Sequence, residues 1–294
     1  MRMARYLIPP PVKLAPFIRY FHVETGVTGE LVVPVTPFPQ IGLMLAGNSR
    51  VYELDGRLKM EASRTFLTGP SSRPIRLQLS PGAAFISILL RVGQLPRLFP
   101  LHCNHLADTS WPLDDVIGVR EEAELFSRVM DAPSLGGRIS LLGDWLLALA
   151  GMREPRGADA FVLPAPRLYL PSDELARQSG LGVRQFERRF LASYGMPLRE
   201  MRRMLRFVNM LAVLIVRPYA HGRLGFLAQE CGYFDQAHMI RDFQLLAGMT
   251  PGEFLSATAD AGRTELGLMR YAGDERELVF GCRNEEVQIV GFRG

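Results

Sequence analysis

The chain has 294 residues, of which 48% are hydrophobic and 22% are charged, and its formal net charge is +4. A chain of this length and composition can bury sizeable cores in two domains, which excludes a largely disordered protein. No apolar run approaches the ~18 residues that a membrane-spanning helix needs, so we expect no membrane as a partner.

The amino-terminal residues and the cysteines indicate the compartment. The Pro cluster at residues 9–11 follows no apolar segment of signal-peptide length, so we expect no signal peptide. Cys103, Cys231 and Cys282 lie far apart and are odd in number, which favours reduced thiols over a disulfide framework. We therefore expect a cytoplasmic protein.

The first part of the chain is predicted to be a β domain. Short β-branched and apolar segments recur there between turn signals such as Asp55-Gly56 and Pro81-Gly82. Strands are expected over residues 31–35, 41–46, 50–54, 64–67, 75–79 and 84–91. Strands at this spacing are typical of a sandwich or a barrel.

The β region offers little for catalysis. A cupin-type metal site needs His-x-His on a strand, and none of the five histidines forms this pattern. The only cluster, His102-Cys103-Asn104-His105, lacks a clear fourth ligand for zinc. A Gly-rich phosphate loop and a Gly-x-Ser-x-Gly elbow are also absent from the sequence. We predict no catalytic residue, no metal and no cofactor.

A helical connector is expected next. Apolar residues recur with a period of about 3.6 over residues 121–130 and 139–150, which predicts two amphipathic helices. Their apolar faces either pack on the β domain or join two protomers in a homodimer. Residues 151–157 have the composition of a linker.

The part after the linker contains one small helical motif twice. In its first copy, Ser172 is expected to cap a short helix, Gly180 to end it, and a second helix to span residues 183–194. Phe186 and Phe190 would face inward on that second helix. Together with an Arg-rich outer face, this pattern indicates a helix-turn-helix unit.

The second copy spans residues 224–255, with a turn at Gly232 and an expected helix cap at Asp235. The copies share equivalent residues: Ala176 with Ala228, Gly180 with Gly232, and Phe190 with Phe243. A helix expected over residues 198–216 joins them. Two copies separated by about 50 residues indicate a pseudo-symmetric pair rather than a solenoid.

Positive charge gathers in this repeat. Residues 167–255 contain twelve arginines, no lysine and eight acidic residues, so this region alone carries a net charge equal to the +4 of the whole chain. A basic surface confined to one domain is typical of a protein that contacts phosphates.

The repeat resembles the DNA-binding domain of the AraC/XylS family of bacterial transcription regulators. The resemblance rests on GYFDQAHMIRDF, GMTPGEFL and the Arg206-Phe207 pair, and it covers about residues 168–255, roughly a third of the chain. It implies a sequence-specific regulator that reads two successive major-groove segments of double-stranded DNA, ~34 Å apart. Residues 66–95 are similar to the sensor half of one subgroup, whose cupin-like domain binds a small effector or dimerises. An activator of this family would also have RNA polymerase as a partner.

The resemblance implies base-reading residues on both second helices. They are Arg184, Glu187 and Arg188 in the first unit and Gln236, Ala237 and Arg241 in the second. Arg can bind guanine, Gln can bind adenine, and Ala can touch a thymine methyl group, whereas Glu187 either accepts from cytosine or only orients Arg188. Contacts with the DNA backbone are expected from Gln185, Arg189, Arg202 and Arg203, although arginines of the joining helix could also merely face solvent.

The expected chain is therefore of the α+β class. It has a β-barrel or cupin-like domain, a helical connector, and an all-α domain with two helix-turn-helix units joined by a long helix. The expected boundaries are 1–110, 111–157, 158–258 and, for an extension of unknown role, 259–294. Short strands or a frayed tail are expected over residues 266–271, 277–280 and 287–292 of that extension.

One departure from the family pattern and one alternative function remain. Gly182 stands where the family usually has a Ser that caps the recognition helix, a change that costs little. The alternative function is an enzyme, either a DNA repair protein with a reactive Cys or a metal-dependent cupin, with an appended DNA-binding module. Cys103 lies in Leu-His-Cys-Asn rather than in the Pro-Cys-His-Arg setting of such repair proteins, so the regulator is favoured.

Overall fold

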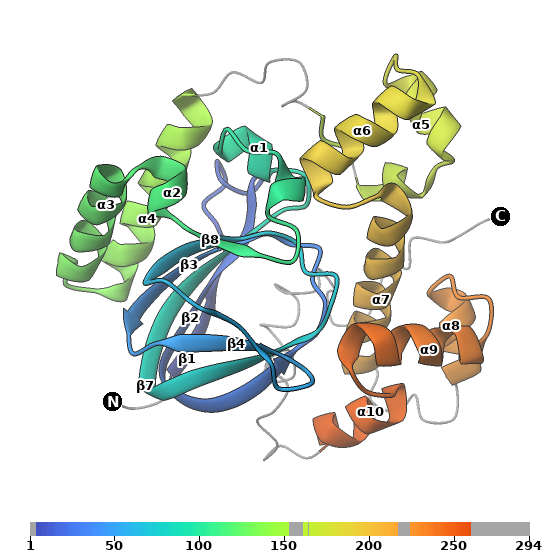
Figure 1. The fold of residues 1–294 in the computed structure, drawn as a ribbon, viewed down its shortest axis with the longest axis horizontal. Coiled ribbons are helices and arrows are strands. Elements are labelled where there is room, and N and C mark those ends of the chain that lie inside the picture. The colour runs from blue at the N-terminus through green and yellow to red at the C-terminus, as the bar shows by residue number, and fades with distance from the viewer. Residues whose placement is uncertain (1–3, 153–160, 164, 217–223, 260–294) are drawn as a thin grey trace.

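The computed structural model describes residues 4–152, 161–163, 165–216 and 224–259, which form two domains packed against each other (Figure 1). A curved sheet with helices on one face makes up the first, called here the β domain (residues 4–152). The second consists of helices alone and is called here the helical domain (residues 165–259). The extension after residue 259, with its three expected strands, and most of the expected linker lie outside the described residues.

The β domain is built on one antiparallel sheet of eight strands. The strands are β1 (Ala4–Ile8), β2 (Ile18–Val33), β3 (Gln40–Ala46), β4 (Ser49–Glu53), β5 (Leu58–Glu61), β6 (Thr65–Thr68), β7 (Ile75–Leu90) and β8 (Ser110–Pro112). Their hydrogen-bonded order is β1-β2-β7-β3-β6-β8, with β4 between β7 and β5. The sequence predicted a sandwich or a barrel. Within the described residues, the strands form one curved sheet with an open strand order.

Two long strands give the sheet its curvature. β7 runs unbroken through Pro81-Gly82, where the sequence predicted a turn between two strands. That prediction was wrong because Gly82, with φ of +76°, bends the strand without ending it. β7 therefore pairs with β4 before the bend and with β3 after it. β2 likewise runs through register shifts between Glu24 and Gly29, and only its last residues were predicted.

The two faces of the sheet carry different side chains, because successive residues of a strand point to opposite sides. In the second half of β7, Ile86, Ile88 and Leu90 are fully buried in the core beneath the helices. Phe85, Ser87 and Leu89 alternate with them and face the concave side. The sheet thus has one face for the helical layer and one for a cavity.

The helices of the β domain cover the convex face. They are α1 (Leu95–Leu98), the 3₁₀ turn η1 (Cys103–His105), α2 (Asp114–Ile117), α3 (Val119–Asp131) and α4 (Leu135–Met152). α3 and α4 confirm the two predicted helices. Leu125, Val129, Leu142 and Leu146 share a core with the sheet, so the interpretation that these helices pack on the β domain is confirmed. The homodimer stays a prediction.

The helical domain contains two helix-turn-helix units joined by a long helix, as predicted. Its helices are η3 (Ala165–Tyr169), α5 (Ser172–Gln178), α6 (Val183–Tyr194), α7 (Leu198–Val216), α8 (Leu224–Glu230), α9 (Gln236–Ala247) and α10 (Pro251–Ala259). The turn glycines Gly180 and Gly232 have φ of +65° and +80°, and the helix-ending Gly195 and Gly248 have +79° and +75°. Glycine adopts this left-handed conformation without the steric cost that other residues incur, so the repeat in sequence is a repeat in backbone geometry.

α7 packs on both units. Phe207 of α7 contacts the ring of Phe243 in α9, with centroids 5.2 Å apart. The Arg202 guanidinium donates to the backbone carbonyls of Leu168 and Leu170 beside the first unit. These contacts fix the position of each unit relative to the same helix.

Candidate nucleic-acid interface and ligand cavity

The first recognition helix, α6, presents a polar face to solvent. Phe186 and Phe190 are fully buried beneath it, as predicted. Arg184, Glu187 and Arg188 are exposed on its first two turns, and the described residues offer none of them an ion pair or a hydrogen-bond partner. Side chains on the N-terminal turns of a recognition helix are the ones that reach base edges.

The helix caps of the first unit differ in part from the prediction. Gly182 is the N-cap of α6 and supplies no side-chain hydrogen bond, as expected for glycine. The N-cap of α5 is Pro171, not Ser172, and it also has no side-chain cap. Ser172 is instead the first helical residue, so that prediction was wrong by one position.

The second recognition helix, α9, has a complete N-cap. The Asp235 carboxylate accepts from the backbone N–H of His238 at 2.6 Å, which confirms the predicted cap. Gln236, Ala237 and Arg241 are exposed on the following turns. The Arg241 Nε donates to the Ala237 carbonyl at 3.3 Å, so this side chain lies along the helix beside the other two.

The four residues predicted to contact the DNA backbone fall into two pairs. Gln185 is exposed and Arg189 half-buried on α6, next to the base-reading candidates. Arg202 has the two carbonyl partners given above, and burial lowers the pKa of its guanidinium. Arg203 donates from Nε to the buried Asp242 carboxylate at 2.8 Å, and its Nη2 forms an ion pair with the same oxygen at 2.7 Å. These two arginines of α7 therefore position the units within the protein.

Phe234 is a candidate contact that sequence reasoning missed. It directly precedes the Asp235 cap and is 85% exposed, although its aromatic ring is apolar. A residue at this position often packs on the helix it precedes, but this one projects into solvent beside the exposed end of α9. The sequence did contain a signal for this residue. Phe234 is an aromatic residue between the turn glycine and the Asp235 cap, and it lies outside the apolar positions that α9 buries.

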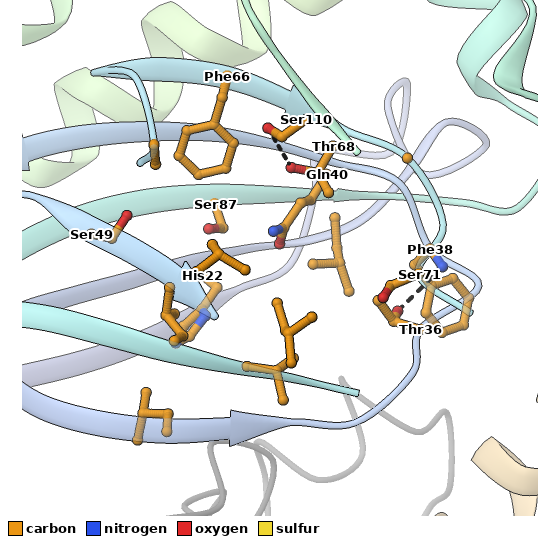
Figure 2. A pocket seen from close by; sticks show the side chains of 18 of the residues that line it. His22, Thr36, Phe38, Gln40, Ser49, Phe66, Thr68, Ser71, Ser87 and Ser110 are labelled. Atoms are coloured by element: carbon orange, nitrogen blue, oxygen red, sulfur yellow. Dashed lines mark hydrogen bonds between the residues drawn. The ribbon is translucent and has the colours of Figure 1, made fainter. Parts of the chain in front are cut away.

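A cavity of about 250 Å³ lies against the concave face of the sheet. Figure 2 shows His22, Gln40, Ser87 and Phe66 around it, from four neighbouring strands. The ring of Phe66 occupies the space over Gly42, where an added Cβ would lie 2.1 Å from its Cζ. The sequence predicted no cavity residues, because the bulges in β2 decide which side chains face inward.

Polar and apolar side chains share this cavity. The His22 Nε2 lies 3.0 Å from the Glu24 Oε1, and Thr68 donates to Ser110 at 3.0 Å. Apolar side chains form much of the remaining wall: Leu31, Val51, Leu77, Leu79 and Phe85. A concave apolar surface with a few placed polar groups is typical of a site for a small molecule.

Two family models match the chain. Residues 175–257 match that of a helix-turn-helix domain, of the AraC type, and these residues include both recognition helices. The chain is a DNA-binding regulator whose helix-turn-helix domain is of the AraC type. Residues 6–112, which form most of its β domain, match a domain of unknown function (DUF6597).

Solved structures similar to this regulator are distant in sequence. ToxT from Vibrio cholerae is 10% identical, with a TM-score of 0.44 over 80% of this chain and 98% of that chain. ToxT from strain SCE256 of the same organism, with bound unsaturated fatty acid, is 11% identical, with a TM-score of 0.42 over 80% and 94%. The AraC-like transcriptional activator CuxR is 13% identical, with a TM-score of 0.25 over 69% and 94%. No curated protein matches the chain.

The histidine–cysteine cluster, residues 102–105, lies where the two domains meet. His102 and His105 stack with ring centroids 5.7 Å apart. Cys103 is buried, and burial raises the pKa of its thiol to about 12. A nucleophilic cysteine needs a thiolate near neutral pH, so this thiol is unsuited to that role. Across the described ranges, no three His, Cys, Asp or Glu side chains cluster as metal ligands do, and no helix there could cross a membrane.

Proposed function

We propose that this regulator reads two successive major-groove segments of one duplex, with α6 in one groove and α9 in the next. The observation that carries this proposal is the exposure of Arg184, Arg188, Gln236 and Arg241 on the N-terminal turns of two helices that one rigid helix joins. Two recognition helices held this way suit grooves one helical turn apart, ~34 Å along the duplex.

The side chains have chemistry suited to base edges. Arg184, Arg188 and Arg241 can each donate two hydrogen bonds to guanine O6 and N7, and Gln236 can bind adenine in the same bidentate manner. Ala237 can contact a thymine methyl group. Glu187 either accepts from cytosine N4 or orients Arg188.

Contacts with phosphates would come from beside these residues. Gln185 and Arg189 flank the base-reading face of α6, and we assign them to the backbone. Arg202 and Arg203 would act indirectly, by holding the first unit and α9 against α7. Phe234 would lie against a sugar or a base methyl group at the start of α9.

The β domain is proposed to supply the signal. Its cavity would hold a small effector, since polar and apolar side chains meet there as in other small-molecule sites. A homodimer, and RNA polymerase as partner of an activator, remain predictions that sedimentation and transcription assays can test. The alternative of a repair enzyme is disfavoured because the Cys103 thiol is protonated at neutral pH.

Selection from a randomised duplex pool at two salt concentrations tests the DNA readout. The wild type should recover a motif with two elements about one helical turn apart. Arg188→Ala should lose selectivity in one element and Arg241→Ala in the other, each with roughly 5- to 150-fold weaker binding to the recovered site, because a bidentate contact discriminates by about 1–3 kcal/mol.

The matched control is Arg120→Ala, which removes the same charge from α3, where the side chain is 93% exposed. Its motif and affinity should equal those of the wild type. Recovery of no motif, together with a steep salt dependence of binding, would mean that only phosphates are contacted and would refute two-groove readout.

A further inference from the structure

Polar side chains without partners among the described residues line the concave face of the β domain: the largely buried Ser49 and Ser87 and the half-buried Gln40. Ser49 on β4 and Ser87 on β7 are only 4% and 7% exposed. Within the described part of the chain, neither hydroxyl has a hydrogen-bond partner, and the same holds for the Gln40 amide. Buried polar groups of native proteins are normally hydrogen bonded. All three side chains lie around the cavity in Figure 2, so a bound molecule would complete their hydrogen bonds.

The charged side chains of the cavity, in contrast, are mostly engaged by the protein. Glu24 contacts His22, and Asp108 accepts from the backbone N–H and hydroxyl of Ser72 at 2.7 and 2.5 Å. The Arg19 guanidinium lies 3.9 Å over the ring of Phe38. Lys59 lies at the edge, where it also lines the cleft between the domains. Apart from Lys59 at the edge, the lining groups that have no partner within the described residues are uncharged.

One wall of the cavity belongs to the helical domain. Val208 and Leu211 of α7 line it, although the remaining lining residues come from the β domain. α7 is the helix that joins the two helix-turn-helix units. A molecule in the cavity would thus touch the DNA-binding half of the same chain directly.

Segments at the rim of the cavity also contact the C-terminal ends of both recognition helices. Val35, a lining residue, donates its backbone N–H to the carbonyl of Leu246 in α9 at 3.0 Å. Pro70, which follows the lining residue Gly69, packs against Gly195 at the end of α6: a Cβ added to Gly195 would lie 2.8 Å from the Pro70 Cγ.

The two rim segments are joined to each other. Thr36 and Ser71 exchange backbone hydrogen bonds of 3.1 and 2.8 Å. A shift of either segment would therefore be transmitted to the other, and through them to both recognition helices.

We propose that the cavity binds an uncharged amphipathic molecule, with a small apolar body and a hydroxyl or carbonyl group, and that this molecule acts on DNA binding within one chain through α7 and the rim. Ser49, Ser87 and Gln40 would bind its polar group. The inferred effect on DNA binding rests on the proposed function. The inferred binding of the small molecule does not.

Photolabelling of the full chain tests the ligand class. The probe is 4-(trifluoromethyldiazirinyl)benzyl alcohol, and its charged counterpart is the corresponding benzoate. The alcohol should label the cavity strands saturably and at lower concentration than the benzoate. In Ser49→Ala/Ser87→Ala, half-maximal labelling by the alcohol should need about 5-fold or more higher concentration, because each lost hydrogen bond costs about 2- to 10-fold in affinity.

Ser127→Ala is the matched control, because it removes an exposed hydroxyl on α3 whose partner is Asp131. It should label like the wild type, and thermal melts should show all variants folded. Three outcomes would each overturn the uncharged ligand class. They are no saturable labelling by the alcohol, stronger labelling by the benzoate, and labelling of the double serine variant equal to that of the wild type.

The route to DNA is tested on the same labelled protein. Peptide mass spectrometry should find label on the α7 segment that contains Val208 and Leu211 as well as on the strands. Affinity for the duplex recovered by selection should change at least about threefold on labelling. Label confined to the strands with unchanged DNA affinity would overturn the coupling. Because labelling needs no DNA, failure to recover a motif would instead count against the proposed function alone.

Discussion

At the scale of single residues, the base-reading candidates and the cavity residues differ in how far sequence could locate them. Arg188 and Arg241 could be placed because helical period and the repeat fix which side of a helix faces out. Ser49 and Ser87 could not, because one bulge reverses the facing of every later residue of a strand, and β2 contains register shifts. The contacts of Arg203 with Asp242 were also beyond sequence, since the partners are 39 residues apart.

Glu122 is a residue whose ionisation should matter for stability. It is a buried carboxylate on α3 that accepts two hydrogen bonds from Arg64, at 3.1 and 2.6 Å, and one from the Thr65 hydroxyl at 2.7 Å. The Arg64 hydrogen bonds, with a smaller contribution from Thr65, hold the pKa of this carboxyl below its usual value. The ionised group thus ties α3 to β6 more strongly than the protonated group would.

Glu122→Gln should therefore lower the free energy of unfolding by about 1.5 kcal/mol at pH 7, since it removes hydrogen bonds to a charged group. A folded-state pKa below the unfolded value means that this contribution is present above the unfolded pKa of about 4.3 and is lost as pH falls through the folded pKa. Urea unfolding at pH 7 and near pH 3 should show the two proteins converging in acid.

The matched control is Glu61→Gln, because Glu61 pairs with Arg50 at 2.7 Å but both side chains are exposed. Its effect at pH 7 should be much smaller. A gap between wild type and Glu122→Gln that stays constant down to pH 3 would contradict an ionised Glu122 as the cause.

At the scale of elements, helices were more predictable than strands. α6, α7 and α9 begin and end close to their predicted residues, since caps, turn glycines and apolar period agree with one another there. The strands β1, β5 and β8 were missed, as was most of β2. β5 and β8 are short, and their side chains lack a clean alternation between buried and exposed. Their place in the sheet is decided by partners distant in sequence.

The N-caps of the two recognition helices should contribute unequally to the free energy of unfolding. Asp235→Ala removes the only side-chain acceptor at the start of α9, so the free energy of unfolding should fall by about 1 kcal/mol. Asp235→Asn keeps an oxygen acceptor and should cost much less. Gly182→Ser adds a cap to α6 and should gain only a few tenths of a kcal/mol.

Thermal unfolding of these three variants, each compared with the wild type, checks the order. An unchanged melting temperature in Asp235→Ala would mean that the start of α9 is frayed in solution and that the cap contributes nothing.

At the scale of the whole molecule, the two domains share an apolar interface. Val35 of the β domain is buried in the main core of the helical domain, and Val92 packs against the same core. Leu54 lies against Gly248 at the end of α9, and Pro70 lies against Gly195 at the end of α6. Sequence predicted both domains but could not predict this contact, because each interface residue also fits an ordinary loop or strand end.

The wild type should therefore unfold in one calorimetric transition, whereas Val35→Ala/Leu54→Ala/Pro70→Ala should split it into two, since the domains keep their own cores. Val12→Ala/Leu58→Ala/Val119→Ala is the control, because these apolar residues are 90%, 49% and 72% exposed. It should unfold like the wild type. One transition at an unchanged midpoint in the interface variant would show that this contact does not couple the domains.

The wall that α7 contributes to the cavity limits how such a protein can evolve. A sensor whose cavity is closed by its own strands can be exchanged between DNA-binding domains as a separate module. Here the cavity lacks a wall unless Val208 and Leu211 come with it. A transplanted β domain would have an opening to solvent in place of an apolar surface, so ligand preference and the joining helix are expected to be inherited together.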